Sequence, residues 1–488
     1  ADLYSDRGAR RIDALFVAHL AAVDAVLAER LAAARAAPAS LAAKDESALL
    51  LALAPHLEDF LAALFGIEPE VRALAARHHE LAPLYAVKRQ FVQRKAMNAH
   101  KADVAAAFDG AALRAQLEAA LGAPFSELGF ARAVTSWLAD ETAHAAALDV
   151  ALRYAAWAAH TPAGRAAHRG GVLFRAPRKL DFGKLVPLAA ETRDGVTAWK
   201  LPPDHALRER DGFALTDPGT DLTGGLDQAH YCIWCHEQGK DSCARGLPEK
   251  KPNPGEAPFR KSPFHVPLAG CPLEERVSEF HKLRAEGVAV GALAMICVDN
   301  PMVAATGHRI CNDCMKACIY QKTDPVDIPQ SETRLLKDVL ALPWGFEVYS
   351  LLTRWNPLDV RRPLPRPRTG RRVLIVGMGP AGFTLAHHLV NDGHTVVGID
   401  GLKIEPLPPS LAGITIAGAR VPFEPVRDLA ALFEPLGDRV MAGFGGVAEY
   451  GITVRWDKNF LKVIRLLLER RDRFALYGGV RFGGTLDD

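Results

Sequence analysis

The chain has 488 residues, 49% hydrophobic and 24% charged, which is the length of about three globular domains. Its 59 Lys and Arg residues nearly balance 57 Asp and Glu, which argues against nucleic acid or an anionic membrane surface as the main partner. Every apolar run of about 18 residues contains a charge or a proline, so no transmembrane segment is expected. The N-terminus lacks the pattern of a secretory signal, so a cytoplasmic location is expected.

Residues 1–165 form an alanine-rich region, with 45 alanines in the first 150 positions. Apolar residues recur every three or four positions from Ile12 to Leu31, which predicts one amphipathic helix. Further helices are expected at 47–65, 70–107, 111–121 and 127–159. The sequence therefore predicts an all-α N-terminal bundle or array whose role is unknown.

Glu141 and His144 lie three residues apart, on one face of an expected helix. Di-iron carboxylate bundles use this spacing, but they need two such pairs and two further glutamates. The region has one pair, so a polar surface pair is the favoured interpretation.

The remaining chain divides where the composition changes. Residues 166–230 indicate a mixed connecting region. A cysteine-rich domain is expected at 231–353, and its proline-rich stretch at 247–270 indicates a surface insertion. Prolines and arginines at 354–371 indicate a solvated, extended linker, and 372–488 has the order of a nucleotide-binding domain. Short strands are expected at Gly171–Phe174 and Thr197–Leu201.

All eight cysteines lie between Cys232 and Cys318. In a chain without a secretory signal, such clustering favours thiolate ligands over disulfides. Four thiolates can hold a tetrahedral zinc ion or one cubane iron–sulfur cluster, so eight suffice for two centres. Spacing alone favours zinc. The Cys271–Pro272 step, which is typical of ferredoxin-type ligand runs, and the redox motif that follows favour iron–sulfur clusters.

A dinucleotide-binding fingerprint follows the linker. An expected strand at 373–376 leads into Gly377-Met-Gly379-Pro380-Ala381-Gly382, a helix and a second strand that ends at Asp400. Gly377 permits the tight turn, Gly379 lets the backbone approach a pyrophosphate, and Gly382 allows the helix to pack closely. Asp400 is placed to accept the ribose hydroxyls. Because strand, turn, helix and acid occur in register, the sequence predicts a Rossmann-like domain.

Short motifs accompany the cysteines and this fingerprint. They are Cys271-Pro-Leu, Asn300-Pro301 leading to Gly307-His-Arg-Ile-Cys311, Cys314-x-x-x-Cys318, Pro325-Val-Asp-Ile328 followed by Glu332, and Gly445-Gly446 with Tyr450-Gly451-Ile452. In this order they resemble the small subunit of glutamate synthase and its relatives, including the N-terminal half of dihydropyrimidine dehydrogenase. The resembling stretch runs from about Cys232 to Asp488.

The resemblance implies a flavoprotein with an α-helical domain for two [4Fe–4S] clusters before a domain for FAD and NAD(P)H. The implied ligands of the first cluster are Cys232, Cys235, Cys243 and Cys318. Those of the second are Cys271, Cys311, Cys314 and, narrowly, Cys297, since Thr306 occupies the place of the usual cysteine. Glu332 is the alternative, because some relatives use a glutamine side chain at this position. The implied FAD contacts are Gly377, Gly379, Pro380, Ala381, Gly382, Asp400, Gly446, Tyr450 and Gly451.

The expected fold is therefore multidomain α and α/β, with a Rossmann-like domain that stops before any NAD(P)H domain. Either a fragment or completion by another subunit would account for this, and a fragment is favoured. The expected function is an oxidoreductase that passes electrons between NAD(P)H, FAD and clusters to a partner protein or subunit, without a catalytic acid, base or nucleophile. The alternative is a zinc-stapled nucleotide-binding module for assembly or regulation.

Overall fold

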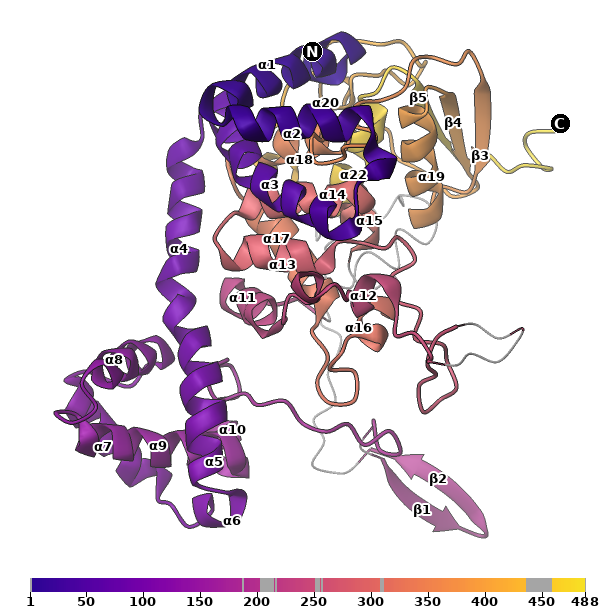
Figure 1. Ribbon diagram of the computed structural model, residues 1–488. Coiled ribbons are helices and arrows are strands. Elements are labelled where there is room, and N and C mark those ends of the chain that lie inside the picture. Colours follow the sequence, from indigo (N-terminus) through magenta and orange to yellow (C-terminus); the bar gives the residue numbers. More distant parts are fainter. Residues whose placement is uncertain are drawn as a thin grey trace.

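The structure is a computed structural model that describes residues 2–186, 188–201, 215, 217–250, 255, 258–307, 311–435 and 459–487. In these ranges the chain is mostly helical, with a two-stranded and a three-stranded sheet. Figure 1 shows a main body, a smaller lobe at the lower left, and the long helix α4 (Glu68–Val87) that joins them.

The other helices of the main body come from both ends of the chain. They are η1 (Asp2–Tyr4), α1 (Asp6–Val23), α2 (Ala25–Ala36), η2 (Pro38–Ser40), α3 (Ala43–Phe65), α11 (Leu222–Tyr231), η4 (Cys235–Gln238), α12 (Ser242–Arg245), α13 (Val277–Ala285), α14 (Ala289–Asp299), α15 (Val303–Thr306), α16 (Asp313–Ala317), α17 (Ile328–Leu340), α18 (Gly345–Leu352), α19 (Pro380–Asn391), α20 (Pro409–Ala412), η5 (Leu429–Leu432) and α22 (Phe460–Glu469). The smaller lobe contains a π-helix, η3 (Lys88–Ala96), then α5 (Met97–Ala99), α6 (Ala102–Ala105), α7 (Gly110–Leu121), α8 (Glu127–Ala139), α9 (Ala145–His160) and α10 (Pro162–Ala167).

The alanine-rich region is divided between two hydrophobic cores. One core joins residues 9–74 to the cysteine-rich and nucleotide-binding regions, and Phe16 and Phe60 both pack against Trp355 there. The second core is formed by residues 84–174 with Leu222 and Leu226 of α11. The first three long helices are therefore part of the main body, while the rest of the region forms the side lobe.

Three expected helices are interrupted. Asp24 separates α1 from α2, because its side chain accepts a hydrogen bond from the Leu27 backbone N–H (2.9 Å) and begins a new helix. His100 adopts an extended backbone after α5, which ends the helix expected over 70–107. Residues 140–144 separate α8 from α9, and there Glu141 forms an exposed ion pair with Lys95.

The side lobe also corrects the strand expected at Gly171–Phe174. These residues form no strand; Val172, Leu173 and Phe174 are buried in the second core. The backbone N–H groups of Val172 and Leu173 both donate to Glu127 Oε2 at 2.9 Å. A side-chain carboxylate thus replaces the partner strand as hydrogen-bond acceptor.

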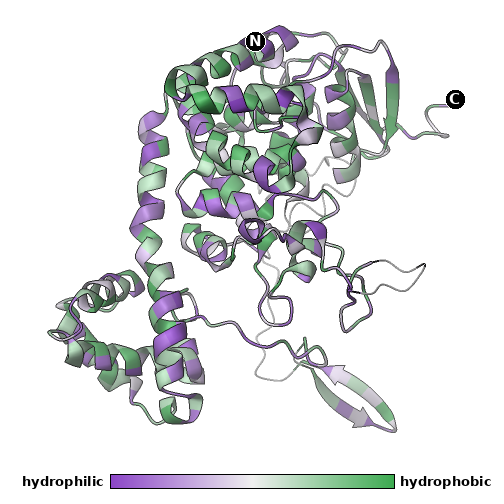
Figure 2. Ribbon diagram, in the orientation of Figure 1, coloured by the Kyte–Doolittle hydropathy of each residue, from purple (hydrophilic) through white to green (hydrophobic). Residues whose placement is uncertain are grey.

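The two sheets differ in setting. The first is an antiparallel hairpin of β1 (Ala189–Arg193) and β2 (Val196–Lys200), which covers most of the second expected strand. It projects from the main body, and both apolar and polar residues of β2 face solvent (Figure 2). The second sheet is parallel, in the order β3 (Arg372–Val376), β4 (Thr395–Asp400), β5 (Phe474–Gly478), with α19 in the crossover. In the described structure β3 is an edge strand, and Val376 is 58% exposed.

One described helix, α3, has the length and hydropathy of a membrane span, and half of that window is buried in the protein. It packs against α14, where Gly291 lies so close that a Cβ would approach the Ala54 carbonyl oxygen within 2.8 Å. This is the position of a core helix, and the single apolar helix is weak evidence for membrane insertion.

The stretch expected to be a solvated linker is more buried than a connector. Trp355, Leu358 and Val360 are almost fully buried, and Trp355 Nε1 donates to Asp13 Oδ1 at 2.9 Å. Farther on, Arg361 pairs with Glu46. The segment therefore fastens the N-terminal helices to the nucleotide-binding region.

Candidate functional site: two thiol groups and a glycine turn

The first thiol group contains Cys232, Cys235, Cys243 and Cys318. All four are buried, and they come from the end of α11, the start of η4, α12 and the end of α16. Burial raises the pKa of the Cys232 thiol to about 12, with smaller contributions from the Cys235 and Cys318 thiols. Burial, with the Cys232 and Cys318 thiols among the lesser causes, also raises the pKa of Cys243. These four sulfurs therefore face a common, poorly hydrated space.

The second thiol group contains Cys271, Cys311 and Cys314. Burial raises the pKa of Cys271 to about 11, with contributions from Glu275 and Cys311. The pKa of Cys314 is raised by burial, by the carboxyl groups of Glu332 and Glu275, and by both other thiols. Because α16 carries Cys314 and ends at Cys318, this one short helix borders both thiol groups.

The base of the proline-rich insertion holds the two groups together. The Cys271 backbone N–H donates to the Cys243 carbonyl oxygen at 2.8 Å, and the Leu247 N–H donates to the Leu268 carbonyl oxygen at 2.9 Å. Gly246 and Gly270 make this approach possible, since a Cβ on Gly270 would lie 2.5 Å from the Gly246 nitrogen. The 27 residues between the two cysteines thus leave and return at one point.

Two buried carboxyl groups complete the surroundings of the second group. Glu332 lies in α17, and its interaction with Cys314 follows from the raised pKa of that thiol. Glu275 is nearly fully buried, and burial and the hydrogen-bonded Glu332 raise its pKa well above the usual range. Its Oε1 has no hydrogen-bond partner among the described residues. Sequence analysis missed Glu275, whose only signal is its position four residues after Cys271.

Cys297 is placed differently. It lies inside α14, fully enclosed, where burial and Glu275 raise its pKa. Burial raises the pKa of the Tyr349 phenol, and the Cys297 thiol raises it further. Cys297 therefore interacts with Glu275, which lies next to the second thiol group. Glu332 interacts with Cys314, a member of that group.

Within the described ranges, no three His, Cys, Asp or Glu side chains converge closely enough to hold a single metal ion. A zinc ion draws all of its ligands to one atom, whereas a cubane cluster binds each thiolate at a different iron and so spaces its ligands more widely. By chemistry alone, the thiols with the Glu332 and Glu275 carboxyl groups beside them are donors that either kind of centre accepts.

The glycine turn has the geometry that phosphate binding requires. Gly377 has φ of +94°, which other residues rarely adopt. A Cβ on Gly382 would lie 2.1 Å from the Gly377 carbonyl oxygen, so only glycine lets α19 begin this close to the turn. Gly379 precedes Pro380 at the start of α19 and provides no side-chain cap, which leaves the first N–H groups of the helix available to an anion. Ala381 lies in the same first turn.

Asp400 ends β4 beside this turn. Its Oδ2 accepts from the Met378 N–H at 2.8 Å and its Oδ1 accepts from the Leu402 N–H at 2.9 Å. Each carboxylate oxygen can accept a further hydrogen bond, so the position remains suitable for a ribose. The other expected flavin contacts, Gly446, Tyr450 and Gly451, lie outside the described residues.

An aromatic pair that sequence analysis did not single out lies next to the first thiol group. The rings of Tyr231 and Tyr320 stack with centroids 4.6 Å apart and planes 13° apart. Tyr231 directly precedes Cys232, and the thiols of Cys318, Cys232 and Cys235 act on the Tyr320 phenol, whose pKa is raised mainly by burial. No spacing rule connects the two tyrosines, because the stack forms only when α11 and the segment after α16 meet.

Comparison with known proteins gives two kinds of relative. A family model described as the RP005 N-terminal alpha-helical domain matches residues 1–66, the segment that forms α1–α3. The protein RP005 of Rickettsia prowazekii is 30% identical over 288 residues, which cover 57% of this chain and 94% of RP005. The protein RP006 of the same organism is 53% identical over 182 residues, 37% of this chain.

The second kind of relative is more distant. The glutamate synthase [NADPH] small chain of Mycobacterium tuberculosis is 30% identical over 128 residues, 26% of this chain. The matched part spans about a quarter of RP006 and of this small chain, at 24% and 23% of their lengths. The resemblance to the glutamate synthase family is therefore a distant and partial similarity to an oxidoreductase.

Proposed function

This chain belongs to the family of the Rickettsia prowazekii protein RP005, and we propose that it is an iron–sulfur flavoprotein oxidoreductase. Its distant similarity to the glutamate synthase small chain supports the redox part of this proposal. In the complete enzyme this chain would pass electrons between NAD(P)H, FAD and two [4Fe–4S] clusters to a partner protein or subunit. The observation that carries the proposal is that cysteine-bearing segments distant in sequence meet: the Cys271 N–H donates to the Cys243 carbonyl oxygen at 2.8 Å, and α12 packs against α16, which carries Cys314 and is followed by Cys318. A cytoplasmic setting belongs to the same proposal.

In this proposal the cysteine thiolates bind the clusters, and the buried ones shield them from water. Five of the seven cysteines in the two thiol groups are buried, Cys271 is partly buried and Cys311 is exposed. Burial and hydrogen bonding are the means by which a protein tunes cluster potentials. Bound FAD would supply the exchange between hydride and single-electron chemistry. The start of α19 would bind its pyrophosphate, and Asp400 would orient its ribose.

For the fourth ligand of the second group we propose Glu332 in place of Cys297. Glu332 acts directly on Cys314, whereas Cys297 lies within α14 beside Tyr349. Glu332→Ala is expected to lower the iron content by about half, since one of two clusters would lose a ligand. Cys297→Ser, the matched control, is expected to retain it. Loss of iron in the serine variant alone would restore Cys297 as the ligand.

The decisive experiment quantifies iron, zinc, acid-labile sulfide and flavin in anaerobically purified protein, with EPR spectra after reduction by dithionite. About eight irons and eight sulfides per chain are expected. Cys235→Ser and Cys314→Ser are expected to remove different halves of the cluster signal, because they belong to different groups. Zinc without labile sulfide would overturn the redox proposal and favour a zinc-stapled module.

A further inference from the structure

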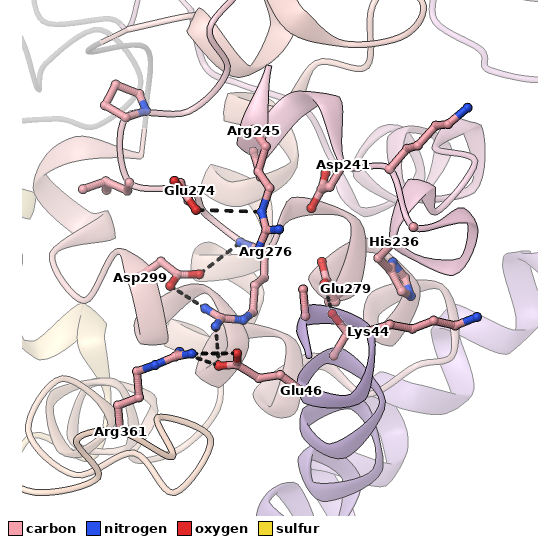
Figure 3. Close-up of a pocket in the computed structure, with 17 residues that line it drawn as sticks. Lys44, Glu46, His236, Asp241, Arg245, Glu274, Arg276, Glu279, Asp299 and Arg361 are labelled. Carbon is pink, nitrogen blue, oxygen red and sulfur yellow. Dashed lines mark hydrogen bonds and ion pairs between the residues drawn. The ribbon is translucent and has the colours of Figure 1, made fainter. Parts of the chain in front are cut away.

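A pocket of about 570 Å³ lies between the N-terminal helices and the loops that carry the first thiol group. One wall comes from the start of α3, including Lys44 and Ser47. The opposite wall comes from His236, Asp241 and Arg245, and its base includes Glu279 of α13. Figure 3 shows these charged side chains around the opening. Neither the expected clusters nor the expected flavin uses this space.

Part of the lining is a closed network of ion pairs. Arg276 pairs with Glu46 at 2.8 Å and with Asp299 at 2.5 Å, and Arg361 pairs with Glu46 at 2.7 Å (Figure 3). These groups satisfy one another and form a rigid wall. Glu279 also interacts with the Arg276 guanidinium, so this wall contributes positive charge near the base of the pocket.

Glu279 is the unsatisfied group at the base. Its side chain is only 2% exposed, and its Oε1 accepts a hydrogen bond from Ser47 Oγ at 2.5 Å. Its Oε2 has no partner among the described residues. A buried carboxylate oxygen without a donor is costly, so its place beside a cavity points to a ligand that donates to it.

The groups around Glu279 define the charge of that donor. Asp241 lies close enough for its carboxylate to repel that of Glu279. His236 also interacts with Glu279, and its Nε2 lacks a hydrogen-bond partner in the described structure, while its Nδ1 is bonded to Ser278 Oγ at 2.6 Å. Two facing carboxylates favour a cationic donor such as an ammonium group.

The rim has the opposite charge. Lys44 and Lys240 line the pocket and are exposed, and neither ammonium group has an ion-pair partner among the described residues. Arg245 lies nearby, 3.8 Å from Glu274. An acid group at the rim would therefore meet positive charge, while Glu279 lies at the base of the pocket.

We propose that this pocket binds a small aliphatic amino acid or a related zwitterion, with its ammonium group on Glu279 and its acid group at Lys44 and Lys240. The pocket is built partly from the RP005-type N-terminal helices and partly from the thiol-bearing loops. Ligand binding would thereby connect the two regions.

The test measures binding to the full chain by isothermal titration calorimetry. The probes are glycine, β-alanine, 4-aminobutyrate and 6-aminohexanoate, which vary the distance between the two charges. Putrescine, without an acid group, and succinate, without an amine, serve as control ligands. At least one amino acid of the series is expected to bind more tightly than both controls. Absence of binding throughout the series, or equal binding of succinate, would overturn the proposal.

Variants locate the site. Glu279→Gln keeps the shape but removes the charge, and is expected to weaken binding about tenfold or more. Glu274→Gln changes an exposed carboxylate of the same pocket and is expected to leave binding unchanged. Lys44→Met, at an exposed position that does not threaten folding, is expected to reduce the preference for the amino acid over putrescine. Unchanged affinity in both Glu279→Gln and Lys44→Met would contradict the assignment.

This inference does not depend on iron or flavin. Binding is measured by heat in protein with and without clusters, so failure of the redox proposal and failure of the pocket proposal give different results.

Discussion

At the scale of single residues, buried carboxyl groups have assignable roles. Glu58 lies in the middle of α3 and accepts hydrogen bonds from the backbone N–H groups of Val290 (2.6 Å) and Gly291 (3.2 Å), at the start of α14. It therefore caps one core helix from another. Burial raises its pKa from the ordinary 4.5 to about 7 despite these two bonds.

This shift gives a pH dependence of stability. Because the pKa is higher in the folded than in the unfolded state, the folded protein holds an extra proton between about pH 4.5 and 7. The favourable contribution is full below this window and is lost as the pH rises through it, to a total of about 3 kcal/mol. Urea unfolding at pH 5 and 8 should show this fall, and Glu58→Gln should reduce it. Equal pH dependence in both proteins would contradict the role of Glu58.

Gly382 permits a second residue-scale prediction. A Cβ at this position would overlap the Gly377 carbonyl oxygen, so Gly382→Ala must displace the start of α19. Flavin binding should weaken by about tenfold or more, because the N–H groups at that helix start would move from the pyrophosphate. Gly401→Ala is the matched control, since a Cβ there has open space. Flavin content after purification and fluorescence titration with FAD measure the effect, and full retention in Gly382→Ala would refute it.

At the scale of elements, the N-terminal η1 joins three parts of the main body. The Tyr4 hydroxyl donates to Glu347 Oε2 at 2.7 Å, and it accepts from Arg470 Nη1 at 3.0 Å and from Ser350 Oγ at 3.2 Å. Arg470 follows α22 and Glu347 lies in α18. The first residues of the chain are therefore bound to the nucleotide-binding region by a buried polar network.

Removing one hydroxyl should loosen this junction. Tyr4→Phe is expected to lower the free energy of unfolding of the main body by about 1–3 kcal/mol, because Arg470 and Glu347 would each lose a buried partner. Tyr477→Phe, on a half-exposed tyrosine of β5, should change stability little. Chemical unfolding of both variants gives the comparison. A loss of similar size in Tyr477→Phe would mean that the network is not the cause.

The sequence predicted the presence of helices and strands better than the residues at which they begin and end. Periodicity identified the long helices of the first 165 residues, and the strand, turn, helix order located β3, α19 and β4. The break at Asp24 was missed because the apolar spacing continues through it, while the local cap at Leu27 decides the helix start. The buried Gly171–Phe174 segment was misread as a strand, because an apolar run has the same pattern in a loop whose N–H groups find a distant carboxylate.

The candidate site shows the same division. The division of the cysteines into two ligand sets comes from the family resemblance and stays a prediction. Glu275 and the pocket at Glu279 were not predicted, because they depend on α13 meeting residues from α3 and from the thiol loops. Such contacts between residues more than 200 positions apart have no local signature.

At the scale of the whole molecule, two cores predict two unfolding transitions. Phe16 belongs to the main body and Phe130 to the side lobe, and both are fully buried. Each alanine substitution should remove about 3–5 kcal/mol from the core that it affects. Differential scanning calorimetry should therefore show Phe130→Ala lowering one transition and Phe16→Ala the other. A single transition shifted equally by both would indicate one cooperative unit.

The closed base of the proline-rich insertion has a consequence for how this chain can change over evolution and in the laboratory. The hydrogen bonds near Cys243 and Cys271 fix the ends of the excursion, and the entropy of closing a loop grows only slowly with its length. Residues can therefore be added or deleted between the two ends while the sulfurs keep their places. Relatives are free to differ in the length of this segment, and it is a natural position at which to splice a tag or a reporter.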